Sequence, residues 1–87
     1  MRVARGDDVA VIVRAAAGEA LTLILDGGES VEHAVLLAAI APLAIERAPM
    51  RVNAVVAGVG ADPADIEAAV AFLDSARSTT GQLLRVA

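Results

Sequence analysis

The pair of side chains best suited to chemistry in this sequence is Glu29 and His33. Positions four apart share one face of a helix, so a carboxylate and an imidazole there can hydrogen-bond. Such a pair can act as a general base. The same spacing also describes a solvated pair near the start of a helix, with no catalytic role. We therefore name Glu29 and His33 as weak catalytic candidates.

Gly58-Val59-Gly60 is a second candidate, for binding a cofactor. It follows an apolar strand and precedes a helix, and exposed backbone amides at such a turn could hold an anion. However, Pro63 stands where a dinucleotide fingerprint would place its third glycine, and no acidic residue ends a following strand at the right distance. A tight turn is the competing interpretation, so Gly58 and Gly60 are weak candidates.

Three acidic residues near position 65 could be mistaken for a metal cluster. Asp62, Asp65 and Glu67 have a spacing that suits helix capping and complements the helix dipole, and no calcium-loop pattern surrounds them. We expect no metal site here or elsewhere in the chain.

The elements that must position these residues alternate between short apolar strands and helices. Strands are predicted over residues 21–25, 52–57 and 82–86, each an apolar run. Helices are predicted from Glu29 or Ser30 to about Arg47, and from Asp62-Pro63 to about Arg77, because proline suits the first helical position. This alternation predicts a single α/β domain over residues 1–87. It is a partial Rossmann-like unit of two or three layers, with about three helices and a short parallel sheet of about three strands.

The segment Val9–Val13 allows two interpretations. Asp7 or Asp8 can cap a helix that runs to about Ala17. Four of the five residues from 9 to 13 are valine or isoleucine, which favours a strand instead. We leave both open, with the helix slightly preferred.

The composition of the chain argues against several classes of function. The net charge is −4, the seven basic residues are all arginines scattered along the chain, and Phe72 is the only aromatic residue. Nucleic-acid binding is therefore not expected. The chain has no cysteine, and its longest uncharged apolar run, residues 34–45, is shorter than the roughly 20 residues that span a membrane. We expect a soluble cytoplasmic protein with no membrane partner.

Hydrophobic residues make up 57% of the 87 residues, more than the usual share of about 45–50%. The predicted helix lacks a polar face over residues 34–45, and Pro42 should kink it. One side of this helix can pack inward on a small sheet, and the other side needs a partner. We predict a subunit interface there, formed by Leu36, Leu37, Ile40, Leu43 and Ile45.

Three sequence motifs in the second half of the chain occur in an order that indicates common ancestry with a known family. They are residues 43–49 with 51–55; Pro63, Asp65, Ile66, Ala69, Val70, Phe72 and Leu73; and Thr80, Gly81, Gln82, Leu84 and Val86. Together they resemble the closing half of a short-chain dehydrogenase/reductase, over about residues 18–87. The resemblance implies that Asn53 is a structural hydrogen-bonding residue at its strand. It also implies that the long helix and the final strand with its helix lie at subunit interfaces.

The resemblance does not extend to the family's chemistry. Its catalytic tyrosine and lysine lie four apart on the long helix, and the matching places here hold Glu29 and His33 in a chain with no tyrosine and no lysine. The family carries its catalytic serine in the segment between a strand and the long helix, but here only Asp26-Gly27-Gly28 separates these two predicted elements. The family's glycine-rich turn that binds the dinucleotide has no counterpart in this sequence. We expect no cofactor.

These observations favour a non-catalytic, truncated and degenerate relative that serves as an oligomerisation, structural or regulatory subunit. Its partner would be a second copy, giving a homodimer, or a full-length reductase. The alternative is an enzyme or ligand-binding subunit, related to oxidoreductases, whose site is completed by another chain. A third possibility is an incomplete gene product without a selected role.

Overall fold

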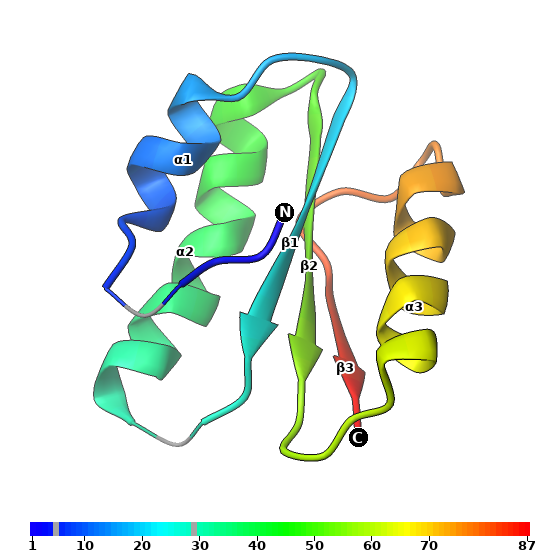
Figure 1. Cartoon of the computed structure of the whole chain (residues 1–87). Helices are drawn as coiled ribbons and strands as arrows, with labels where there is room; N and C mark the ends of the chain where they lie inside the picture. The colour runs from blue at the N-terminus through cyan, green and yellow to red at the C-terminus, as the bar shows by residue number, and fades with distance from the viewer. Residues whose placement is uncertain (5, 29) are drawn as a thin grey trace.

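The computed structural model describes residues 1–4, 6–28 and 30–87. Within these ranges the chain forms three helices and three strands that alternate along the sequence (Figure 1). They are α1 (Val9–Ala15), β1 (Ala20–Asp26), α2 (Val31–Arg47), β2 (Arg51–Ala57), α3 (Pro63–Ser75) and β3 (Leu83–Val86). The predicted α/β class, with its short parallel sheet, is confirmed.

The three strands form one parallel sheet in the order β1-β2-β3. A short N-terminal segment extends it, because Arg2 pairs with Ile24 in a parallel bridge at the outer edge of β1. The Val3 amide donates to the Ile24 carbonyl at 2.9 Å, and the Ile24 amide donates to the Met1 carbonyl at 2.8 Å. The sequence analysis did not foresee this additional pairing.

The helices lie on both faces of the sheet, so the unit has three layers (Figure 1). One core joins α1 and α2 to the side chains of Leu23, Val52 and Ala54. The other core joins α3 to Val55 and Ala57, which point to the opposite face because side chains alternate along a strand.

The two crossovers have opposite hands. The strands β1, β2 and β3 are parallel and advance in one direction, but α2 and α3 lie on opposite faces. In Figure 1 the β1–α2–β2 connection is right-handed, and the β2–α3–β3 connection is therefore left-handed. Only about 2% of parallel crossovers are left-handed. The last strand and its helix thus depart from the usual winding.

The segment 9–13 is helical, which settles the alternative that the sequence left open. The carboxylate of Asp8 accepts a hydrogen bond from the Val11 amide at 3.3 Å, which satisfies a donor that the first helical turn leaves free. Val9 and Val13 are four apart and both buried, so these two valines pack on one helical face, whereas Val11 is exposed.

Polar contacts join α1 to α2. The guanidinium of Arg14 makes two hydrogen bonds to the Glu46 carboxylate, at 2.7 and 3.0 Å. Arg47 donates to the carbonyl of Ala16 at 2.6 Å, beyond the C-terminal end of α1. The two helices therefore form one layer, which we call the α1–α2 layer.

Candidate functional site

The carboxyl ends of the three parallel strands meet at one edge of the sheet, where ligands usually bind in open α/β folds. Asp26 ends β1 and forms a salt bridge with Arg2 at 2.8 Å, with both side chains more than half exposed. The amide of Gly27 donates to the Ala57 carbonyl at 2.6 Å. A Cβ atom at Gly27 would lie 3.0 Å from that same carbonyl oxygen, so the glycine serves close packing of the two strand ends.

The structure describes only one member of the pair Glu29 and His33. Glu29 lies outside the described residues. His33 is half-buried in the first turn of α2, where its amide donates to the Ser30 hydroxyl at 3.1 Å. Its Nε2 atom is buried and has no hydrogen-bond partner among the described residues. The catalytic role of the pair therefore stays a prediction.

Gly58-Val59-Gly60 forms a turn after β2. The Gly58 amide donates to the Val86 carbonyl at 2.8 Å, so it already has an acceptor and does not face a ligand. Gly60 has a φ of +81°, which glycine adopts without strain. The Ala61 amide donates to the Gly58 carbonyl at 3.1 Å and closes the turn. This geometry favours the interpretation as a tight turn.

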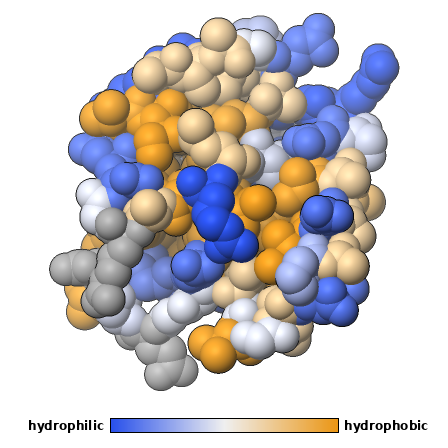
Figure 2. Space-filling model, viewed as in Figure 1, coloured by the Kyte–Doolittle hydropathy of each residue, from blue (hydrophilic) through white to orange (hydrophobic). Residues whose placement is uncertain are grey.

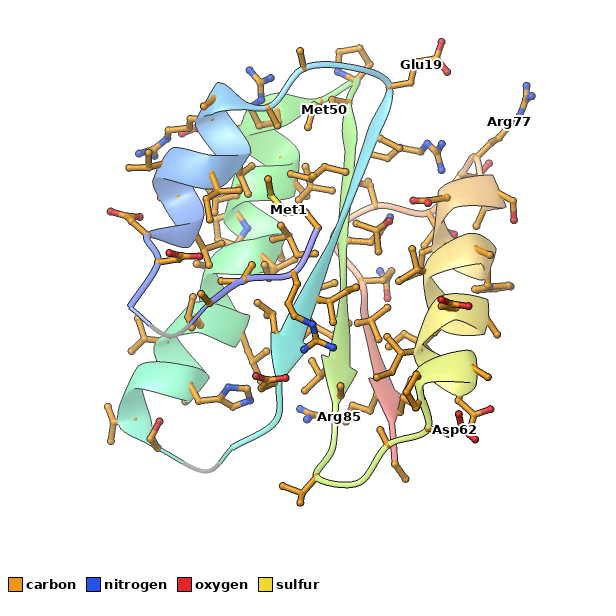
Figure 3. All side chains as sticks on the ribbon, viewed as in Figure 1. Met1, Glu19, Met50, Asp62, Arg77 and Arg85 are labelled. Atoms are coloured by element: carbon orange, nitrogen blue, oxygen red, sulfur yellow. The ribbon has the colours of Figure 1, made fainter. Side chains whose placement is uncertain are left out.

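The acidic residues of α3 take helix-terminal roles. Asp62 caps the helix by accepting a hydrogen bond from the Ala64 amide at 2.9 Å, and Asp65 lies in the first turn. Figure 3 shows Asp62 at the end of α3 opposite to Arg77. In the described part of the chain, no group of three or more histidine, cysteine or acidic side chains could hold a metal ion.

Asn53 is a structural residue, as the resemblance implied. It is 1% exposed, donates from Nδ2 to the Thr79 carbonyl at 2.9 Å and accepts at Oδ1 from the Gln82 amide at 3.0 Å. Its side chain thus ties the middle of β2 to the loop that leads into β3.

Two further polar contacts fasten α3 to the sheet, and the sequence analysis missed both. Thr22 donates to the Asp74 carboxylate at 2.6 Å. Arg51 donates to the carbonyls of Leu73, Asp74 and Ala76, at 3.3, 3.1 and 2.9 Å, where the end of the helix leaves acceptors free. The partners are more than 20 residues apart in the sequence, so spacing gave no signal for them.

The outer surface of the α1–α2 layer is apolar. Val31, Val35 and Ile45 of α2 are 81%, 64% and 79% exposed, and Val11 of α1 is 61% exposed. Figure 2 shows hydrophobic residues reaching the surface over α1. We define the outer stripe as the exposed apolar residues on the side of α2 that faces away from the sheet: Val31, Val35, Ala38, Pro42 and Ile45.

The five residues of the predicted interface differ in how far they are exposed. Ile40 and Leu43 are 0% and 5% exposed and belong to the core of this chain, whereas Ile45 is exposed. Leu36 and Leu37 are half-buried against the same core. Helical periodicity explains the division, because Ile40 and Leu43 lie on the side of α2 that faces the sheet. The side chains of Ile40 and Leu43 are therefore not available to a partner, whereas those of the outer stripe are exposed.

No helix in the described part of the chain combines the length and hydropathy that a membrane crossing requires. The helix α2 continues through Pro42, whose side chain is exposed. Proline there leaves the carbonyl of Ala38 without its intrahelical donor, and solvent reaches this side of the helix.

The comparisons with known proteins agree with this architecture. The model of the SDR-like family, described as short chain dehydrogenase-like protein, matches residues 4–86. No curated protein and no solved structure matches the chain. The family match begins before residue 18, so it includes α1 as well as the strands and helices that follow. The chain therefore belongs to the SDR-like family of short chain dehydrogenase-like proteins.

Proposed function

We propose that this chain is a non-catalytic member of its family that acts as an association module through the α1–α2 layer. Its partner is a second copy of itself or a full-length reductase. The observation that carries the proposal is the outer stripe, in which three large apolar side chains are each more than 60% exposed on one helix.

The free energy gained by burying apolar side chains supports the proposal that a partner covers this surface. Full burial of a valine or isoleucine side chain contributes roughly 1.5–3 kcal/mol. Burial of Val31, Val35 and Ile45 would therefore contribute several kcal/mol, which is comparable with the stability of a small domain. Two charged groups at the C-terminal end of α2 are engaged within the chain, because Glu46 binds Arg14 and Arg47 binds the Ala16 carbonyl. Contact with a partner would leave this ion pair and this hydrogen bond intact.

The chemistry of the sequence supports the non-catalytic part of the proposal. The chain has neither a tyrosine nor a lysine, the residues that the family resemblance places four apart on α2. In such enzymes a phenol donates a proton while an ammonium group lowers its pKa. The carboxylate and imidazole of Glu29 and His33 do not reproduce this arrangement.

The proposal is tested by sedimentation velocity at tens of micromolar, with the chain alone and mixed with a reductase from the same host. We expect a species larger than the monomer in one of the two samples. Val35→Lys should weaken that assembly at least tenfold, because it places an ammonium group in the apolar contact. The matched control is Phe72→Lys, which alters an exposed apolar residue of α3 and should leave the assembly intact. A monomer in both samples would refute the association module.

A further inference from the structure

The last strand of the sheet, β3, leaves one row of backbone groups without a partner (Figure 1). The carbonyls of Gln82 and Val86 accept hydrogen bonds from β2 at 2.9 and 2.8 Å, so the even-numbered residues face β2. Successive residues of a strand direct their amide and carbonyl groups to alternate sides. Those of Leu83 and Arg85 therefore point away from β2, where no further strand follows in the described part of the chain. Such a row is a template on which another extended chain can pair.

A hollow of about 350 Å³ lies beside the start of β3. It is lined by Phe72 and Leu73 of α3, by residues 78–80 of the following loop and by residues 82–84, and none of these residues is charged. Leu84 lies on the same face, because it packs against the core under α3. Phe72 is 61% exposed.

A strand added beside β3 would place one of its side chains next to Leu84, with the two Cβ atoms about 4.5–5.5 Å apart. This side chain would point toward the hollow and could cover the exposed ring of Phe72. Because the lining offers no counterion, the hollow selects an apolar side chain. Backbone pairing at an edge with one side chain held in a pocket is how proteins bind extended peptides by strand addition.

The opposite face of β3 has a different chemical character. Leu83 and Arg85 lie on this face, because side chains alternate along a strand and Leu84 faces α3. Arg85 is exposed and forms no ion pair with the described acidic residues. The residue that follows the apolar one in an added strand would lie beside Arg85, where a carboxylate is favourable. The edge therefore fits a segment in which apolar and acidic residues alternate.

A second copy of the chain fits this edge less well. The strand β3 contains no acidic residue, so two copies paired here would leave Arg85 without a counterion or opposite the second Arg85. Like charges directly opposite each other are destabilising. An acidic strand of another protein supplies the missing carboxylate.

From these observations we propose that the free edge of β3 binds an extended acidic peptide segment of another protein, with an apolar side chain in the hollow beside Phe72 and a carboxylate beside Arg85. Because β3 has only four residues, the contact is small and should be weak. This site is separate from the outer stripe and does not depend on the proposed association function.

The test titrates the chain with a short blocked peptide in which valine alternates with glutamate. On saturation, hydrogen exchange at the Leu83 and Arg85 amides should slow at least tenfold, because both then donate to the peptide backbone. The Ala54 amide already donates to the Gln82 carbonyl within the sheet, so it is the internal control and should not change. The same peptide with every amide N-methylated should not bind, because it cannot donate to the outward carbonyls.

A second peptide, with lysine in place of glutamate, tests the role of Arg85. The net charge of the chain is −4, so non-specific attraction would favour the lysine peptide. We expect the glutamate peptide to bind more tightly by up to roughly fivefold. Arg85→Glu should reverse this preference. Arg77→Glu, at an exposed position beyond the end of α3, changes the net charge equally and should retain it.

Phe72→Ala tests the hollow and should weaken the binding of both peptides severalfold. The matched control is Val59→Ala, at an exposed apolar residue that does not line the hollow, and it should bind as the unmodified chain does. Val35→Lys in the outer stripe should also bind the peptide normally. The peptide site and the proposed association function can therefore fail independently of each other.

Four results would overturn the proposal. They are no binding of the glutamate peptide even at millimolar concentration, equal or tighter binding of the lysine peptide to the unmodified chain, and protection of amides other than those of Leu83 and Arg85. The fourth is protection of the Leu83 amide that rises with protein concentration in the absence of peptide, which would show that a second copy occupies the edge.

Discussion

The helices α2 and α3 each cover one face of the same sheet, but their outer sides differ. The exposed positions of α3 include the acidic residues Asp65 and Glu67 on its flanks, together with Phe72 and small alanines on the side opposite the core. The outer stripe of α2 has no charged residue. Of the eight large apolar residues that are exposed in the described part of the chain, four lie on the α1–α2 layer: Val11, Val31, Val35 and Ile45. This cluster is the surface on which the proposed association depends.

The inner sides of the two helices resemble one another. Ile40 and Leu43 of α2 are buried in one core, and Ile66 and Leu73 of α3 are buried in the other. The sheet is thus covered on both faces within a single chain, as parallel strands require. What distinguishes α2 is that it exposes three large aliphatic side chains on its outer side, whereas α3 exposes Phe72 and small alanines.

The largest effect should come from the inner side of α2. Ile40→Ala should lower the free energy of unfolding by about 2–5 kcal/mol, because Ile40 is 0% exposed and its truncation leaves a cavity. Val35→Ala, on the outer side of the same helix, should change the stability of the monomer by less than about 0.5 kcal/mol. Urea denaturation at low protein concentration measures both. Equal losses would remove the distinction between the two sides of α2.

A second large effect should come from the link between β2 and the loop before β3. Asn53→Ala removes the partners of the Thr79 carbonyl and the Gln82 amide, and an unsatisfied buried group costs about 1–3 kcal/mol. Gln82→Ala is the control, since Asn53 contacts only the backbone of Gln82 and the side chain is exposed. If Gln82→Ala were as destabilising as Asn53→Ala, the assigned role of the Asn53 amide would be wrong.

The order and class of the elements could be predicted from local signals. The apolar run ended by Asp26-Gly27-Gly28 indicated β1, and Asp62-Pro63 marked the start of α3, which the structure places at Pro63. The long helix was predicted to end at Arg47, where α2 ends. The end of α3 was placed two residues too late, at Arg77 instead of Ser75, because no strong stop signal lies there.

Other features could not be predicted, because they depend on distant partners. The sequence pattern showed that the helix over residues 34–45 is apolar all round. Periodicity then separates Ile40 from Ile45, but the packing of α2 on the sheet decides which of the two is covered. The cap of α3 by Arg51 and the pairing of Arg2 with Ile24 also join segments that are far apart in the sequence. The opposite hand of the last crossover has no local sequence signal.

A smaller effect is expected where α3 is fastened to the sheet. Arg51→Ala removes three hydrogen bonds to carbonyls at the end of α3 and should lower the free energy of unfolding by about 1–2 kcal/mol. Arg77→Ala is the matched control, because Arg77 is exposed near the same end of the helix and extends away from it (Figure 3). Hydrogen exchange should show faster opening of the last turn of α3 in Arg51→Ala alone. Unchanged protection there would mean that the guanidinium does not cap the helix.

The smallest expected change in stability comes from the Arg14–Glu46 ion pair between α1 and α2, and it depends on pH. The hydrogen bond from Arg14 holds the pKa of Glu46 below its ordinary value. A carboxylate whose pKa is lowered on folding stabilises the fold above its unfolded pKa, about 4.3, and loses this contribution as the pH falls through the folded value. Both side chains are exposed, so the contribution is small and should decrease with added salt.

Glu46→Gln removes the titrating carboxylate, so the stability of this variant should fall less steeply with pH below about 4.3 than that of the unmodified chain. The matched control is Glu67→Gln at an exposed position of α3, which leaves the Arg14 pair intact and should retain the steeper fall. Urea denaturation at a series of pH values measures the three curves. A Glu46→Gln curve parallel to that of the unmodified chain would show that the pair does not fasten the α1–α2 layer. The position of Val11 beside the outer stripe would then depend on apolar packing alone.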